Sequence, residues 1–445
     1  MASSPLLSVP TELLLAVVEA IDDVASLRGF ALTCKLACVL AEPVLYRAVL
    51  VTTGSQASRL AKALQQQQPS TRADLVQALD LRLAYSRDAN VEVLTPLLGT
   101  MTQLRALSIE SPFAIWHSGA GRAPWEALTQ GFRTLFLDAQ CGAGLQKLES
   151  LTIHWSTEAS SFWLLREFKP ILTLPALQSL TVSRAVLDDD LIDGLDAFAG
   201  TTPLTYLELI ECFVSPKALT AVLALPRALR SCHLGFMRHS PSDPGNYHSA
   251  SPEQHLEALH QQRFSLQQLI WFDRDFAYDT DVCRVSTIPG SGLYDFTELH
   301  TLTLDGASAL LLSTLLSECA PRHLDRLRLI RHDTGTLLDH PADSVIFTRI
   351  PGIPPPFALH QHLPTLHYLD IVFLSRTYNT KLWTKPDRCD HVKRLGEDYH
   401  ARGICLTIFA ANRGGVVPPY LFGEEPPREK PVYHAENAWF SPEMT

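Results

Sequence analysis

The sequence predicts an α/β protein in which a short helical domain precedes an irregular, curved array of strand-and-return repeats built on a parallel sheet. Two patterns predict this fold class. Between residues 9 and 47, apolar residues recur at three-to-four-residue spacing, as on one face of a helix. From residue 76 onward, an apolar residue, two variable residues, Leu, one variable residue and another apolar residue form a core that returns ten times.

The amino-terminal part reads as three short helices. Thr11 can cap the first helix, and Glu12 lies near its positive end. Asp22 and Asp23 interrupt the apolar pattern and can start a second helix, and small residues form one face of a third. Because three short helices bury little surface, we expect an apolar edge that needs cover from the following domain or from a partner.

The ten repeat cores alternate apolar and variable residues, which is the spacing of a strand and not of a leucine-rich helix. The cores begin at Val76, Leu104, Leu148, Leu177, Leu204, Leu229, Leu266, Leu299, Leu324 and Leu366. The short steps between them are 25 to 29 residues, a period typical of leucine-rich repeats. The Asn or Cys expected in the turn after each core is clear only at Cys212, so the array should be irregular.

The remaining segments complete the expected domain plan. We expect helical returns at 56–67, 125–137, 188–198, 216–225, 252–261 and 309–318, a leading strand at 46–51, and a closing helix and strand at 392–400 and 404–409. The predicted domains are 1–47 (helical), 48–411 (repeats) and 412–445, a proline-rich and disordered tail. Turn-rich insertions are expected at 238–251, 273–296 and 332–363.

Composition excludes several classes of protein. The net charge of −10 and the lack of a basic stripe argue against nucleic acid as a partner. No apolar run approaches the ~20 residues of a membrane span, and no secretory signal pattern is present, so we expect a cytoplasmic or nuclear protein. Nine scattered cysteines fit reduced thiols better than a disulfide framework.

Three ordered segments carry a family resemblance. They are Val9-Pro10-Thr11-Glu12-Leu13-Leu14-Leu15, Leu32-Thr33-Cys34-Lys35-Leu36 and Glu42-Pro43-Val44-Leu45-Tyr46-Arg47. Together they resemble the F-box, a helical module that docks onto the adaptor of a cullin-type ubiquitin ligase. The match departs from the usual pattern at Leu36, where many members carry Trp. With repeats behind it, the chain is similar in layout to divergent F-box and leucine-rich-repeat proteins of fungi.

The resemblance implies a role and a set of adaptor-binding residues. The chain would be a non-catalytic substrate-recognition subunit of a cullin-RING (SCF-type) ubiquitin ligase, binding a Skp-family adaptor and, through it, a cullin. The implied adaptor-binding residues are Val9, Pro10, Leu13, Leu14, Val17, Val18 and Ile21. The alternative is a non-catalytic leucine-rich-repeat scaffold in which residues 9–47 only cap the array.

The array is expected to bind a protein substrate through its concave face. If the core Leu, Ile and Val residues point inward, the residues between them face the concave surface. The candidates for substrate binding are His154, Tyr206, Glu208, Phe272, Asp305, Arg326, Arg328, Tyr368 and Asp370. Tyr and Phe are typical interface anchors, and the two arginines could pair with an acidic partner segment. A plain solvated sheet surface is the open alternative.

The sequence lacks the motifs of an enzyme. Gly290-Ser291-Gly292 has no adjoining strand and helix for a nucleophile elbow, and Cys34 and Cys38 lack a second ligand pair at zinc spacing. Asp188-Asp189-Asp190 fits a helix start better than a cation site. We therefore expect no catalytic residue, no cofactor and no metal. The alternative is a hydrolase or metalloenzyme whose site lies in the inserted loops.

Overall fold

The computed structural model describes residues 9–65, 72–82, 92–110, 123–155, 162–235, 252–272, 288–305, 314–332, 356–375, 386–412 and 429–436. Most of the three predicted insertions lies outside these residues. The chain forms two compact units, Met1–Ser161 with Glu167–Leu177, and Phe162–Arg166 with Gln178–Thr445. They are described separately below.

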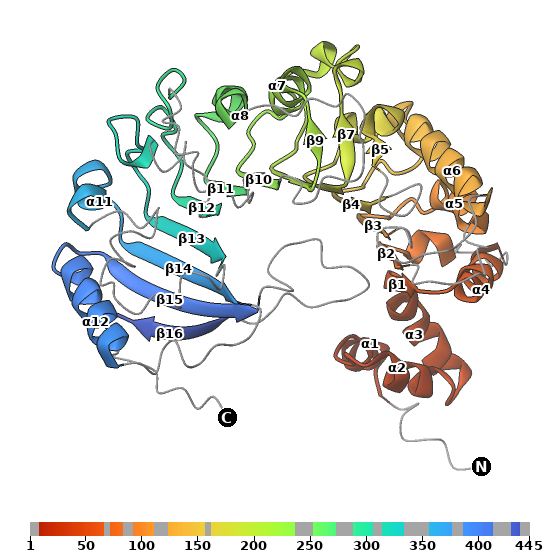
Figure 1. Ribbon diagram of the computed structural model, residues 1–445. Coiled ribbons are helices and arrows are strands. Elements are labelled where there is room, and N and C mark those ends of the chain that lie inside the picture. Colours follow the sequence, from red (N-terminus) through yellow and green to blue (C-terminus); the bar gives the residue numbers. More distant parts are fainter. Residues whose placement is uncertain are drawn as a thin grey trace. The chain divides into compact units, whose positions relative to one another are not determined.

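The first unit begins with three helices, which we call the helical module (Figure 1). They are α1 (Thr11–Glu19), α2 (Val24–Ala31) and α3 (Lys35–Arg47). The Asp23 carboxylate caps α2 by accepting hydrogen bonds from the N–H groups of Ala25 and Ser26. The small core between the helices consists of Leu14, Val18, Leu27, Leu40 and Ala41.

Four parallel strands follow in the same unit, in spatial order β1 (Ala48–Val51), β2 (Ala78–Arg82), β3 (Ala106–Glu110) and β4 (Ser150–His154). The returns between them contain α4 (Gly54–Gln65), η2 (Arg72–Leu75), η3 (Glu92–Leu94), α5 (Thr95–Leu98) and α6 (Ala123–Gln140). Leu79, Leu107 and Leu151 occupy one register position and are buried. The repeat core therefore forms the buried row of the sheet. Helix α3 continues into β1 without a loop.

The second unit contains a nine-stranded sheet. Its strands are β6 (Ser179–Ser183), β8 (Tyr206–Ile210), β10 (Ser231–Gly235), β11 (Gln268–Phe272), β12 (Thr301–Asp305), β13 (Arg326–His332), β14 (Tyr368–Ser375), β15 (Cys405–Asn412) and β16 (Lys430–His434), in that spatial order. All neighbours are parallel except β16, which runs antiparallel to β15. Leu207, Leu302 and Leu327 are fully buried on one face, and the opposite face is called the open face here.

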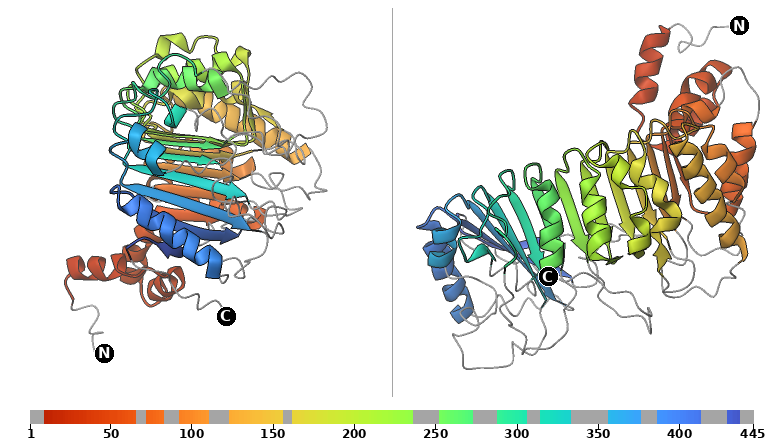
Figure 2. Two further views of the ribbon diagram at one scale, coloured as in Figure 1. Left: turned by 60° about the vertical axis from the view of Figure 1, so that its left-hand side comes forward. Right: turned by 90° about the horizontal axis from the view of Figure 1, so that it is seen from above.

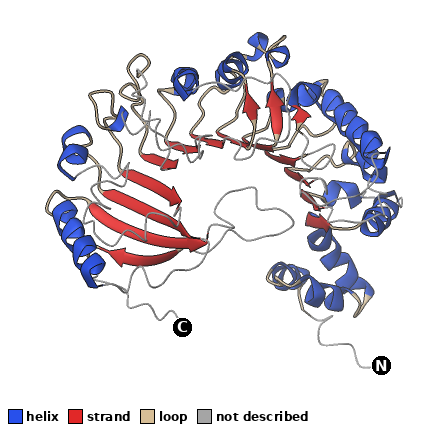
Figure 3. Cartoon of the chain, in the orientation of Figure 1, coloured by secondary structure: helices blue, strands red, loops and turns tan. Residues whose placement is uncertain are grey.

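Helices cover the buried face of this sheet (Figures 1 and 2). They are α7 (Pro216–Ala224), α8 (Pro252–Leu259), η8 (His260–Gln262), α11 (Pro356–His362) and α12 (Pro386–His400). A smaller parallel sheet joins β5 (Trp163–Leu164), β7 (Ala185–Leu187) and β9 (Phe213–Val214), as Figure 3 shows. The Trp163 indole donates to the Ser183 carbonyl at 2.9 Å, which fixes this sheet to β6. The 3₁₀ segment η5 (Leu165–Thr173) crosses from this unit into the first.

All ten repeat cores form parallel strands, which confirms that part of the prediction. The helices predicted at 56–67, 125–137, 216–225, 252–261 and 392–400 are also present, within a few residues at their ends. Cys212 is buried, and its thiol lies 3.3 Å from the Ile210 carbonyl in the turn after β8, the role expected of that position. Part of the helix predicted at 309–318 lies outside the described residues.

Three predictions were wrong in part. Residues 188–198 form two 3₁₀ turns, η6 (Asp189–Leu191) and η7 (Asp196–Phe198), because Gly194 between them has a positive φ of 72°. The insertion predicted at 332–363 contains α11. The tail predicted as disordered contains β16, whose Tyr433 is buried against α12, where Gly396 has no side chain to obstruct it. Trp439 and Phe440 of the tail lie outside the described residues.

Candidate functional site

The helical module exposes an unusual number of large apolar side chains. They are Leu13, Leu15, Val17, Val24, Leu32, Leu36 and Val39, and we call this set the module surface. Leu13 is 58% exposed and Leu32 is 87% exposed. Large exposed apolar patches in soluble proteins mark sites of protein contact. The module therefore leaves seven large apolar side chains open to solvent beside its own core.

The seven predicted adaptor-binding residues divide between the surface and the core. Pro10, Leu13 and Val17 are exposed. Leu14 and Val18 point into the module core and are almost completely buried, and Val9 and Ile21 pack partly against that core. Leu14 and Val18 therefore hold the helices together instead of lying on the surface that the sequence predicted for them.

Polar contacts connect the helical module to the residues that follow it. The Arg72 guanidinium lies 2.5 Å from the Glu42 carboxylate of α3 and 5.6 Å from the centre of the Tyr46 ring. Arg47, the last residue of α3, pairs with Glu19 of α1 at 3.4 Å. The Arg72 contacts join α3 to the residues that follow the module, whereas the Arg47–Glu19 pair lies within the module.

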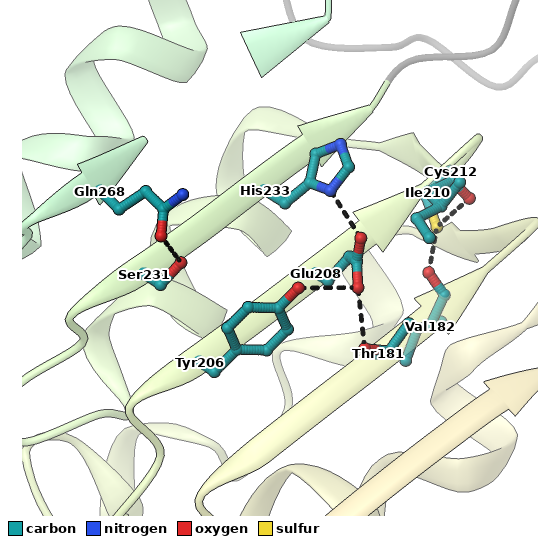
Figure 4. Close-up of polar contacts among 9 residues, drawn as sticks. All are labelled: Thr181, Val182, Tyr206, Glu208, Ile210, Cys212, Ser231, His233 and Gln268. Carbon is teal, nitrogen blue, oxygen red and sulfur yellow. Dashed lines mark hydrogen bonds and ion pairs between the residues drawn. The ribbon is translucent and has the colours of Figure 1, made fainter. Parts of the chain in front are cut away.

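The open face of the second unit carries a hydrogen-bonded cluster centred on Glu208 (Figure 4). The Thr181 and Tyr206 hydroxyls donate to one carboxylate oxygen at 3.0 and 2.9 Å, and His233 Nδ1 lies 2.6 Å from the other. The register places Thr181, Glu208 and His233 side by side on β6, β8 and β10. The side chain of Glu208 is only 14% exposed.

Electrostatics in this cluster favour an ionised carboxylate. Burial alone would raise the pKa of Glu208, but the hydrogen bonds from His233, Tyr206 and Thr181 outweigh it and leave that pKa below its ordinary value. Burial raises the pKa of Tyr206, and the negative charge of Glu208 raises it further. Because the acceptors of Glu208 are occupied, the cluster stiffens the open face more than it offers a ligand site.

The predicted arginines of the open face are also engaged within the chain. Arg326 donates to the Asp370 carboxylate at 2.7 Å and lies over the Tyr368 ring. Arg328 pairs with Glu429, just before β16. An acidic partner segment, as expected for both arginines, would have to compete with Glu429 at Arg328 and with Asp370 at Arg326, whose side chain is 42% exposed.

The other candidate residues are found in different settings. Phe272 belongs to an apolar cluster on the open face with Ile330, Val372 and Ala411. His154 lies on β4 in the first unit and is buried, so it does not join the candidates of the second unit. Asp305 ends β12, but its side chain lies outside the described part of the chain.

Two of the residues that make these contacts, His233 and Glu429, were not predicted from the sequence. The alternation around Cys232 and Leu234 places His233 on the open face, so the repeat pattern contained the necessary signal. Glu429 had no such signal, because it lies 101 residues from Arg328 in a segment without periodicity.

A shallow recess of about 320 Å³ lies on the sheet of the first unit. Its lining includes Ala48, Ala78 and Ala106, with Asp80 as the charged residue. Within the described ranges, no group of three or more His, Cys, Asp or Glu residues is arranged to hold a metal ion. Over the same ranges, no helix combines the length and apolarity that crossing a bilayer requires.

Comparison with known proteins does not assign this chain to a family. No family model and no curated protein matches the chain. Among solved structures, a chain in the crystal structure of the Rad7 and Elc1 complex in yeast is similar, with 14% identity and a TM-score of 0.27 over 81% of this chain and 88% of that chain. A similarity this low does not assign a function.

Proposed function

We propose that this chain is the substrate-recognition subunit of an SCF-type cullin-RING ubiquitin ligase. In this proposal the helical module binds a Skp-family adaptor, and through it a cullin, while the repeat array binds a protein substrate. The chain itself performs no chemistry. The observation that carries the proposal is the module surface, where the apolar side chains are exposed although the helices have their own core.

The physical argument is one of burial. Covering a large apolar side chain gains about 1.5–3 kcal/mol, so a partner seated on Leu13 and Val17 gains affinity without breaking any polar contact. The F-box resemblance of residues 9–47 supplies the identity of that partner. Exposed leucines also occur elsewhere, and Leu137 of α6 is 53% exposed. It therefore provides a matched control.

The test measures affinity for a purified Skp-family adaptor by calorimetry. Leu13→Ala combined with Val17→Ala should weaken binding at least about tenfold, since each truncation removes a contact of the kind that dominates interfaces. Leu137→Ala should leave the affinity unchanged. Equal affinity of wild type and the double variant, with an unchanged melting temperature, would overturn the docking assignment.

The second candidate is a leucine-rich-repeat scaffold in which the module is only an amino-terminal cap. The contacts of Arg72 with Glu42 and Tyr46 favour it, because a cap must pack on the element that it covers. Deleting residues 1–47 should aggregate a capped array. A deleted chain that stays soluble and folded would exclude the cap as the module's main role.

A further inference from the structure

Arginine side chains lie over aromatic rings where strands β11 to β14 begin. The guanidinium carbon of Arg263 lies 4.3 Å from the centre of the Phe264 ring, and that of Arg322 lies 3.8 Å from the centre of the Tyr294 ring. We call these four residues the arginine–aromatic edge. Arg326 lies 4.5 Å from the Tyr368 ring centre in the same region, but Asp370 already neutralises it.

The strand register places Phe264 and Arg322 near each other, and Arg263 directly precedes Phe264. Gln268 of β11 and Arg326 of β13 occupy the same register position through Thr301 of β12. Phe264 and Arg322 each precede that position by four residues. Counted back from that position, Phe264 and Arg322 precede strands whose backbones are about 10 Å apart at ~4.8 Å per strand.

Neither stacked arginine has a carboxylate partner among the residues that the structure describes. Arg263 donates to the carbonyl of His260 at 3.0 Å, and Arg322 has its ring contact with Tyr294. Asp295 follows Tyr294 directly, but its carboxylate accepts from the Ser291 hydroxyl at 2.6 Å. This contrasts with Arg72, Arg326 and Arg328, which all pair with acidic residues.

A guanidinium stacked on a ring is prepared to bind an anion. The ring restricts the side chain without using its N–H groups, which remain suited to bidentate contact with a carboxylate. Phe264 is 66% exposed and Tyr294 is 37% exposed, so an occupant would also bury aromatic surface. Arg and Tyr are the residues most often found at the energetic centres of protein interfaces.

We propose that the arginine–aromatic edge binds an extended acidic segment of a protein partner, with two carboxylates on the same face of that segment. Alternate side chains of an extended chain share a face, so acidic residues two or four positions apart span about 7 or 13 Å, which brackets the strand separation of about 10 Å. This inference rests on the proposed function, in which the array is the partner-binding part. It assigns recognition to the strand-start edge, because Glu208, Arg326 and Arg328 of the open face are already paired.

The test uses the full-length chain and two labelled twelve-residue Gly/Ser peptides. One peptide carries three Glu residues at alternate positions, and the other carries Gln at the same places. Fluorescence anisotropy should show that the Glu peptide binds at least about tenfold more tightly, as expected for charge-assisted contacts. Added salt should weaken this binding, because the contacts are solvent-exposed.

Single substitutions test whether the peptide binds at the arginine–aromatic edge. Arg263→Ala and Arg322→Ala should each weaken Glu-peptide binding about fivefold to tenfold, while Arg59→Ala, which removes an exposed arginine from α4, should not. Tyr294→Phe keeps the ring and should retain binding, whereas Tyr294→Ala should lose most of it. A melting temperature for each variant separates loss of contact from loss of fold.

Two results would overturn the inference: equal binding of the Glu and Gln peptides, or equal losses from Arg59→Ala and Arg322→Ala. Adaptor affinity measured on the same variants keeps the two proposals apart. If Arg322→Ala binds the adaptor as wild type does, a negative peptide result counts against the edge alone. If the module variants bind the adaptor normally, the ligase role fails while the peptide result stands by itself.

Discussion

The helical module and the open face of the second unit differ in whether their surface side chains already have partners within the chain. The module exposes Leu13 and Val17 beside a complete core, so a partner can cover them at no cost in existing contacts. On the open face, Glu208 and Arg328 are already engaged by residues of the same chain. A partner there would have to displace hydrogen bonds. The comparison teaches that surface position alone does not identify a binding residue.

The largest expected effect separates core from surface within α1. Leu14→Ala should lower the free energy of unfolding by about 2–5 kcal/mol, because it opens a cavity in the module core. Leu13→Ala, one residue away, should change it by less than about 0.5 kcal/mol, because that side chain is exposed. Urea unfolding of both variants provides the measurement. Equal losses would contradict the division of α1 into a core face and an exposed face.

The next effect tests whether the Glu208 cluster stiffens the open face. Glu208→Gln should lower the free energy of unfolding at neutral pH by about 1–3 kcal/mol, because the hydrogen bond with His233 and the shared acceptor for Tyr206 and Thr181 are disturbed. Thermal unfolding measures it. Thr303→Val, on the same face outside the cluster, is the control and should cost less.

The same variant has a pH signature. The pKa of Glu208 in the folded chain lies below its ordinary value of 4.5, so its stabilising effect is fully present above that value. It is lost as the pH falls through the lower folded value. The difference in stability between wild type and Glu208→Gln should therefore shrink with acidification from about pH 5 downward. A constant difference would contradict the assignment of an ionised Glu208.

The smallest expected effect concerns Arg328 and Glu429. Both side chains are about one-quarter exposed, so Arg328→Gln should cost less than about 1 kcal/mol. Its clearer readout is hydrogen exchange at Val432 and Tyr433, which should become faster if the ion pair holds β16 in place. Unchanged exchange would show that Tyr433 packing against α12 is sufficient.

The parts of the fold that repeat locally could be predicted, and the parts that depend on distant contacts could not. Each core such as Leu204 to Leu209 contains its own alternation, so its strand and its buried row follow from a few neighbouring residues. Strand β16 contains Pro431 and has no repeat, and it forms only because β15 and α12 are already present.

The candidate site was predictable to a similar degree. Alternation placed Tyr206 and Glu208 on the open face, and the same rule applied to the next repeat would have placed His233 beside them. That Glu208 is satisfied, or that Arg328 meets Glu429, depends on three-dimensional partners. In α1 the spacing indicated one apolar stripe, and only the packing of α2 and α3 divides Leu14 from Leu13.

Strand β16 also limits how the sheet of the second unit can grow. It is the last strand in the order, and its exposed residues Lys430 and Pro431 lie at that margin. Proline lacks an N–H group and lysine carries a charge, and both discourage another chain from extending the ladder. We therefore expect β16 to prevent chains from joining edge to edge into filaments at that end of the sheet, even at high protein concentration. The segment that does so has no periodic pattern in its sequence.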